Sequence, residues 1–286
     1  MLSPIQFASA DAFLQHAQTT LLQDEAANGL MLGICIRLRD YPERILAAPF
    51  LFTIDREPHQ IVLAAIMTPP HNLILHCAET CDPSILEMLA GHLIAQGWAI
   101  PGVLGPAAIS ERFAERWAQR TGCQARVHQR QRGFELRQVI PPLPAPGRFR
   151  PAELSDLPLL TEWARAFYQD ALHEDLTLEQ ARAMTALKID DRQLYVWDAN
   201  EPVSMAAVGR PTPHGISVSF VYTPPRQRGR GYASNCVAVL SQHMLDEGYQ
   251  FCTLFTDLAN PVSNAIYQHI GYRPIFDYTE YHFEND

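Results

Sequence analysis

The run that decides the fold is Val221-Tyr222-Thr223-Pro224-Pro225-Arg226-Gln227-Arg228-Gly229-Arg230-Gly231-Tyr232-Ala233-Ser234. It joins a strand-like run, Ile216 to Thr223, to an amphipathic helical pattern that extends to about Glu247. The two prolines end the strand, and the two glycines allow a close backbone turn. The first N–H groups of a helix have no intrahelical partner, so this turn is a ready-made anion site. Three arginines add positive charge, and a diphosphate is the expected guest.

The same run has two other interpretations: a solvated surface loop or a nucleic-acid-binding tail. A tail would not stand between a strong strand and a strong helix. The formal net charge of −9, with 22 basic and 31 acidic residues, also argues against a duplex nucleic acid partner. The pattern therefore favours a phosphate cradle, and the acidic balance is compatible with a cationic small molecule as the second substrate.

Alternating and helical patterns surround this run on both sides. The pattern predicts helices over 156–168, 177–187, 231–247 and 260–270, and strands over 193–198, 203–209, 216–223, 251–256 and 275–283. The first half gives a weaker echo, with strands over 50–54, 60–67, 73–77 and 98–104 and helices over 84–96 and 107–121. A degenerate internal duplication explains this echo, and two unrelated α/β segments are the alternative.

A second informative run extends from Thr256 to Tyr272. Asn260 followed by Pro261 is typical of a helix start, and Gly271 ends that helix. Asn260, Asn264 and Tyr267 stand at offsets 0, 4 and 7, so they share one helix face. Two amides and a phenol on one face predict a polar wall beside the strand. The alternative is that Tyr267 is an ordinary core residue of an amphipathic helix.

Both runs resemble the conserved segments of the GCN5-related N-acetyltransferases, the GNAT superfamily. The first is similar to Arg/Gln-x-x-Gly-x-Gly/Ala, with Arg228, Gly231 and Ala233 in the fixed positions; a start at Arg226 also fits the spacing. The second is similar to a segment that contains Asn260 or Asn264, Tyr267, Gly271 and Tyr272. The resemblance covers the chain from about Phe149 onward. It implies an α/β (α+β) fold with two tandem GNAT-like domains, each a mixed, mostly antiparallel sheet flanked by helices.

The resemblance also implies a cosubstrate, acetyl-CoA, and a role for each matching residue. The backbone of Val221 and Thr223 would contact the pantetheine arm, and the loop would wrap the diphosphate. The asparagines would contact the pantetheine amides, and Tyr267 would protonate the leaving CoA thiolate. The residues expected to bind the cofactor are Val221, Tyr222, Thr223, Arg228, Gly229, Arg230, Gly231, Tyr232, Ala233, Ser234, Asn260 and Asn264.

The general base stays open in the sequence. Ser217 and Ser219 are poor bases, and Asp257 and the run His173-Glu174-Asp175 are more typical of solvated polar groups. The backbone N–H of Val221 is the expected donor to the oxyanion.

The clearest boundary is the proline-rich stretch near Val139 to Gly147. The expected domains are a degenerate GNAT-like domain over 1–140, a linker over 141–147 and a catalytic domain over 148–286. Where the first half should hold a cofactor loop it has Cys77-Ala78-Glu79-Thr80-Cys81-Asp82-Pro83, without glycine or arginine. That half is expected to have lost the cofactor and to wall the acceptor site.

Other patterns exclude several classes. Lys188 is the only lysine and has no glycine loop before it, so a P-loop is absent and a Schiff-base lysine is not expected. The six cysteines are expected to be buried reduced thiols, and no metal site is predicted, because the nearest cluster, His76, Cys77 and Cys81, has no second ligand pair. No apolar run reaches membrane length and the N-terminus lacks a signal-peptide pattern, which favours a cytoplasmic protein without a membrane partner.

The sequence therefore predicts a cytoplasmic acetyl-CoA-dependent N-acetyltransferase that acts on an amine of a small molecule or peptide. The alternatives are a non-catalytic acyl-CoA-binding sensor and a structural pairing domain. A homodimer stays open, and the acceptor and acyl-chain length are not specified.

Overall fold

The computed structural model describes residues 2–45, 47–57, 60–77 and 81–284. The chain forms two compact units. Unit 1 comprises Met1–Gly133, Asp257–Ala259 and Ile275–Asp286, and unit 2 comprises Phe134–Thr256 and Asn260–Pro274.

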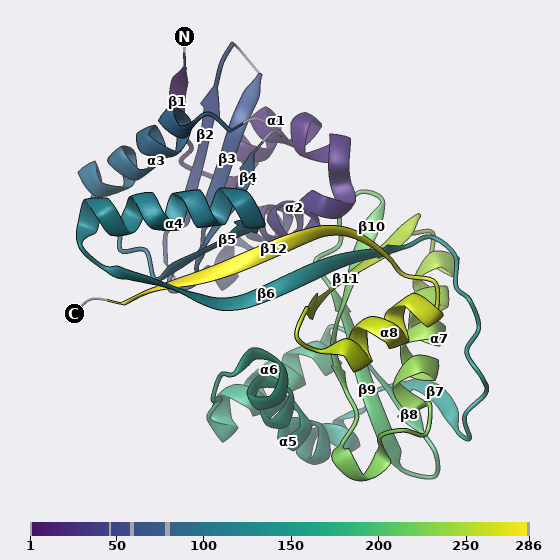
Figure 1. The fold of residues 1–286 in the computed structure, drawn as a ribbon. Coiled ribbons are helices and arrows are strands. Elements are labelled where there is room, and N and C mark those ends of the chain that lie inside the picture. The colour runs from purple at the N-terminus through teal and green to yellow at the C-terminus, as the bar shows by residue number, and fades with distance from the viewer. Residues whose placement is uncertain (1, 46, 58–59, 78–80, 285–286) are drawn as a thin grey trace. The chain divides into compact units, whose positions relative to one another are not determined.

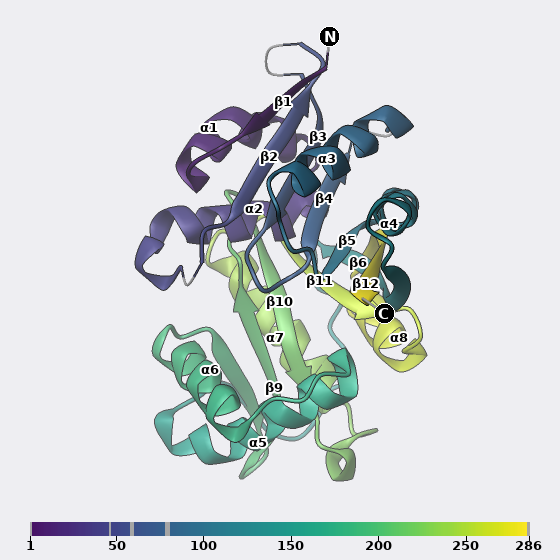
Figure 2. The same ribbon diagram turned by 90° about the vertical axis from the view of Figure 1, so that its left-hand side faces the viewer.

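Unit 1 is a sheet covered by two helices on each face (Figure 1). Its strands follow the order β1 (Ser3–Gln6), β2 (Phe50–Asp55), β3 (Ile61–Met67), β4 (Leu73–Cys77), β5 (Gly102–Pro106), β12 (Arg273–Glu284) and β6 (Gln124–Leu136). The pair β4–β5 is parallel, and the pairs β1–β2, β2–β3, β3–β4 and β5–β12 are antiparallel. Helices α1 (Ala10–Leu21) and α2 (Glu25–Asp40) pack on one face, and α3 (Pro83–Ala95) and α4 (Ala107–Thr121) on the other, as Figure 2 also shows.

Unit 2 repeats this architecture. Its strands follow the order β6, β11 (Phe251–Asp257), β10 (Gly215–Tyr222), β9 (Pro202–Gly209), β8 (Leu194–Asp198) and β7 (Arg148–Pro151). Helices α5 (Leu157–Phe167) and α6 (Leu178–Asp190) pack on one face, and α7 (Tyr232–Asp246) and α8 (Pro261–His269) on the other. The pair β10–β11 is parallel, whereas β7–β8, β8–β9 and β9–β10 are antiparallel.

The two halves of the chain share one order of elements. Both read strand, two helices, three strands, helix, strand, helix, strand. The predicted fold class is thus confirmed, and the repeat favours the internal duplication over two unrelated segments. The strands β6 and β12 each contribute residues to both units, since β12 from Ile275 onward belongs to unit 1 and β6 from Phe134 onward belongs to unit 2.

The predicted elements agree with the structure to within about four residues at each end, the largest difference being the start of β5. Among the α-helices and strands of the described residues, the sequence analysis missed five: β1, α1, α2, β6 and β7. Within the described part of the chain, no helix has the length and apolar character needed to cross a membrane. All six cysteines are free thiols, and only Cys77 is partly exposed.

The proline-rich stretch has no regular structure and packs within unit 2. The indole Nε1 of Trp197 donates to the Pro146 carbonyl at 2.8 Å, and the Asn235 amide donates to the Leu143 carbonyl at 3.0 Å. The predicted division into domains 1–140 and 148–286 stays a prediction. What the structure adds is that this segment is held by unit 2 over its length.

Gly147, at the end of this stretch, should not tolerate a side chain. Its φ is +119°, and a Cβ there would lie 2.6 Å from the Asp198 carbonyl oxygen. We expect Gly147→Ala to lower the free energy of unfolding by about 2–4 kcal/mol, measured by urea denaturation. Gly209→Ala is the matched control, because no atom lies within 4 Å of its built Cβ and its φ is not positive. Equal stabilities of the two variants would contradict this reading of the contact.

Candidate functional site

The strand β10 carries a bulge near its C-terminal end. Its register with β9 shifts between Ser219 and Tyr222, and Phe220 has a φ of +60°. A positive φ is a genuine outlier for a bulky residue, and such strain is concentrated at functional sites. The bulge changes the face to which the side chains point: Val218 packs with α7, whereas Phe220 packs with α5 and α6. The local backbone is therefore turned out of the regular ladder.

The strands β10 and β11 pair only along their first halves. The parallel register joins Gly215, Ile216 and Ser217 to residues 251–253 and then stops, although both strands continue. Val221 lies beyond this pairing and inside the bulge, so it has no ladder partner in the register with β9 or with β11. Backbone N–H and C=O groups released in this way need other partners. A ligand with amide and carbonyl groups can provide them.

The loop from Pro224 to Gly231 turns the chain from β10 into α7. Gly229 and Gly231 have φ values of +76° and +78°, which glycine adopts without strain. Gly231 is the N-cap of α7, and no side chain caps this helix in the described structure. The first N–H groups of α7 and the positive end of its dipole are consequently available to an anion. Such donors are what the predicted phosphate site requires, and the binding of a phosphate here stays a prediction.

Arg228 stabilises the conformation of this loop through hydrogen bonds at both ends of its guanidinium group. Its Nε donates to the Thr223 carbonyl at 2.9 Å, and one Nη donates to the Asp170 carboxylate at 2.9 Å. The guanidinium also lies over the Tyr222 ring. Asp170 belongs to the short π-helix Tyr168–Leu172 that follows α5. Asp170 is a residue that sequence analysis missed, because no spacing rule connects it to a loop 58 residues later.

The two asparagines of the expected polar face of α8 already make hydrogen bonds within the protein. The Asn260 side chain accepts from the Ser263 N–H as the helix cap. The Asn264 amide donates to the Asn260 carbonyl at 2.8 Å, and its oxygen accepts from the Thr256 hydroxyl at 2.5 Å. Asn264 therefore connects α8 to the end of β11. The predicted contact of these amides with pantetheine remains a prediction.

Tyr267 lies in the core of unit 2. It is 8% exposed and packs edge-on against Tyr272 with ring centroids 5.9 Å apart. Burial, with a smaller contribution from Cys236, raises the pKa of the Tyr267 phenol above its ordinary value. The residue keeps its proton at neutral pH. Its burial fits the core interpretation of Tyr267, and its retained proton fits the predicted acid.

The remaining predicted site residues lie along this strand, loop and helix. Tyr232 is buried at the start of α7, whereas Ala233 and Ser234 are partly exposed and Arg230 is exposed. The structure thus places Val221 to Ser234 in one continuous segment from the bulge to the first turn of α7.

The candidates for the base have different environments. The Ser217 hydroxyl accepts from Arg210 at 2.9 Å and is 5% exposed. His173 ends the short π-helix with a φ of +56°. Asp257 belongs to unit 1. The base therefore stays unassigned.

Comparison with known protein families identifies the family to which most of unit 2 is related. The family model described as Acetyltransferase (GNAT) family matches residues 157–272. Residues 157–272 are a GNAT domain. The match includes β10, the loop, α7 and α8, and it supports an acyl-CoA-dependent N-acetyltransferase in general. Among curated proteins, no sequence matches the chain.

Solved structures extend the likeness to the whole chain. A GNAT-family acetyltransferase from Colwellia psychrerythraea covers 99% of this chain and 100% of its own at 11% identity, with a TM-score of 0.58. A GCN5-related N-acetyltransferase from Sphaerobacter thermophilus covers 98% and 94% at 16% identity, with a TM-score of 0.61. A tandem GNAT protein from the clavulanic acid biosynthesis pathway covers 98% of both chains at 12% identity, with a TM-score of 0.57. At these identities the likeness concerns the tandem fold.

In the order of elements, the segment between β4 and α3 of unit 1 corresponds to the loop between β10 and α7 of unit 2. Residues 78–80 of the predicted non-binding loop lie outside the described residues. The parallel pairing of β4 with β5 joins Leu73 and Ile74 to Val103 and Leu104 and then stops, much as β10 and β11 pair only at their starts. The expected loss of the cofactor from the first half stays a prediction.

Alkaline pH should destabilise the protein through its buried phenols. Burial raises the pKa of Tyr267, Tyr272 and Tyr278 above the ordinary value near 10. Since the folded-state pKa is the higher one, the stability is fully present below pH 10 and is lost as the pH rises through the folded values. We expect urea midpoints that are unaffected by these groups from pH 7 to 9 and fall above pH 10. Tyr272→Phe should reduce that fall, and an unchanged slope would contradict the assignment.

Proposed function

We propose that the GNAT domain transfers an acetyl group directly from acetyl-CoA to an amine of a small molecule or peptide. The observation that carries the proposal is the combination of the β10 bulge at Phe220 with the uncapped start of α7 after Gly231. The first releases backbone groups for the pantetheine arm, and the second provides N–H donors for the diphosphate. The family match is the independent support for this assignment.

The reaction needs a neutral amine and a stabilised oxyanion. An alkyl amine with a pKa near 10.4 is almost fully protonated at pH 7, so its deprotonation costs about 4–5 kcal/mol. The amine nitrogen then attacks the acetyl carbon, a C–N bond forms, and the C–S bond breaks. We assign the Val221 N–H to the oxyanion, since this group has no ladder partner in the described registers.

Tyr267 is proposed to return a proton to the leaving sulfur. Its raised pKa keeps the phenol protonated, but it also makes the phenol a weaker acid than a thiol with a pKa near 8.5. The proton is therefore expected to move as the C–S bond breaks and not before. The proton lost by the amine passes to water or to the unassigned base, and a proton from solvent restores the Tyr267 phenol before the next turnover.

We propose that the amine acceptor is cationic. We also propose that the protein acts in the cytoplasm. The chain carries a net charge of −9, and most of the excess acid follows Gly147. Polyamines, aminoglycosides, amino sugars and basic peptides share the required chemistry: an amine beside further positive charge.

A mass-spectrometric screen of the purified chain with acetyl-CoA and an amine panel tests this function. The proposal predicts an acetylated product, a mass increase of one acetyl group, and free CoA in equal amount. Binding of acetyl-CoA without product from any amine would favour the non-catalytic sensor. The absence of any thermal shift with CoA would favour a structural pairing domain.

A further inference from the structure

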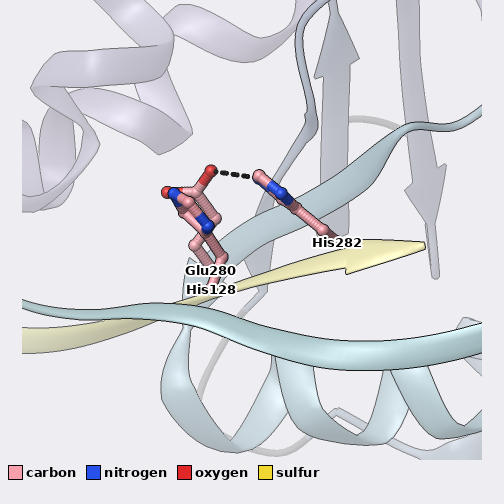
Figure 3. A group of neighbouring side chains, drawn as sticks. All are labelled: His128, Glu280 and His282. Atoms are coloured by element: carbon pink, nitrogen blue, oxygen red, sulfur yellow. Dashed lines mark hydrogen bonds and ion pairs between the residues drawn. The ribbon is translucent and has the colours of Figure 1, made fainter. Parts of the chain in front are cut away.

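A group of metal-ligand side chains in unit 1 has no place in the acetyltransferase chemistry. His128 on β6 and Glu280 and His282 on β12 bring their ligand atoms within 4.8 Å of one another. Figure 3 shows the three side chains together above the two strands. We propose that these residues bind a Zn²⁺ ion that joins β6 to the last strand of the chain.

The strand pattern explains why the ligands meet. Side chains alternate along β12, and Tyr281 and Phe283 pack against the core under α3 and α4. Glu280 and His282 therefore share the opposite face of the sheet. His128 reaches them from β6, and its ring stacks on that of His282 with centroids 3.9 Å apart.

The ligand types suit zinc. Two imidazoles and one carboxylate are a known zinc set, with a fourth position left for water. Tetrahedral zinc with ligand bonds near 2.0–2.1 Å needs ligand atoms about 3.3 Å apart. Binding therefore requires the two stacked imidazole rings to rotate so that each ring plane contains the metal. In the structure, the His282 Nε2 lies 3.0 Å from the Glu280 Oε1 in a hydrogen bond, which bonds to the metal would replace. Mg²⁺ and Ca²⁺ prefer oxygen ligands and should bind poorly.

The carboxylate is already oriented by a neighbouring residue. The Asn72 amide donates to the Glu280 Oε1 at 2.6 Å, and the Gln131 amide approaches the other oxygen at 3.4 Å. Glycine at position 102 makes the approach of Asn72 possible, because a Cβ there would lie 2.6 Å from the Asn72 Oδ1. Gly102 stands opposite His282 in the β5–β12 register. Outer partners of this kind position metal ligands, and their loss costs about 10–100-fold in metal affinity.

The expected role is a clamp on the C-terminal strand. His128 and His282 are separated by more than half of the chain, and unfolding removes the preformed site. Zinc should thus stabilise unit 1 whether or not unit 2 turns over acetyl-CoA. The proposal is independent of the proposed function.

Calorimetry of the untagged, chelator-treated full chain with ZnCl₂ tests the clamp. We expect one Zn²⁺ per chain and a Tm higher by about 5–10 °C at a hundredfold excess over Kd, with no such effect of MgCl₂. His282→Ala and His128→Ala should each weaken binding at least 100-fold, and Asn72→Ala about 10-fold. His71→Ala, at an exposed histidine of the same unit, should leave it unchanged.

Glu280→Gln keeps the shape of the side chain and separates loss of ligation from loss of folding. It should weaken zinc binding while the metal-free chain retains its circular dichroism and melting curve. No binding of Zn²⁺ by the wild-type chain would overturn the proposal. Equal zinc affinity of the wild type and the three ligand variants would overturn it as well.

Discussion

Gly231→Asp is expected to weaken coenzyme A binding by at least 100-fold. Gly231 is the N-cap of α7 with a φ of +78°, and the site is proposed to hold a diphosphate. A carboxylate about 5 Å from a phosphate charge costs about 3 kcal/mol at an effective dielectric constant of 20. That energy corresponds to a factor above 100 in Kd. Equilibrium dialysis with labelled CoA measures the change directly.

Gly231→Asn is the matched control for this prediction. Asparagine has nearly the shape of aspartate, and both tolerate the left-handed region better than other residues do. The Asn235 amide and the Ala145 Cβ lie 3.6 and 3.7 Å from the built Cβ, so a side chain has room at its base. The neutral variant should bind CoA within about tenfold of the wild type. A similar loss of CoA affinity in both variants would show that the added side chain disturbs the loop sterically, and it would contradict an electrostatic effect on a bound phosphate.

Tyr267→Phe is expected to lower kcat by about 100-fold while KM for acetyl-CoA stays nearly constant. A positioned general acid typically contributes 10²–10⁴-fold, and the substitution removes only the hydroxyl. Release of free thiol from acetyl-CoA, followed with the amine that the panel identifies, provides the rate. Full turnover by this variant would remove Tyr267 from the mechanism and leave it as a core residue.

Tyr272→Phe separates a chemical effect from a packing effect. The Tyr272 hydroxyl shares a hydrogen bond with Ser241 at 2.8 Å, and its ring packs against Tyr267 in the same core. Its removal should lower the free energy of unfolding by about 1 kcal/mol and leave kcat unchanged. An equal loss of kcat in both variants would indicate that damage to the core slows the reaction.

The parts of unit 2 that the sequence predicts well have strong local determinants. The end of β10 is set by Pro224 and Pro225, the start of α7 by Gly231, and the start of α8 by Asn260 and Pro261. These residues limit the backbone by themselves, through a fixed φ, a positive φ or a side-chain cap. For this reason the glycine loop and its helix could be placed from the sequence alone.

The features that the sequence analysis missed depend on tertiary contacts. No glycine marks the bulge at Phe220, whose strain only the surrounding packing can maintain. The pairing of Arg228 with Asp170 joins segments that are distant in sequence. The strand β6 is polar along most of its length, so it lacks the alternation that predicts a strand, and its partner β12 lies more than 130 residues later in the chain. Ligands from these two strands form the proposed zinc site.

Titration of the wild-type chain with coenzyme A in a calorimeter tests the central proposal most directly. The glycine loop before α7 and the release of β10 from β11 predict one binding site per chain, in unit 2 alone. The result predicted is a stoichiometry of one, with the heat abolished in Gly231→Asp and retained in Gly231→Asn. No heat with the wild type, or a heat that survives in Gly231→Asp, would contradict the account.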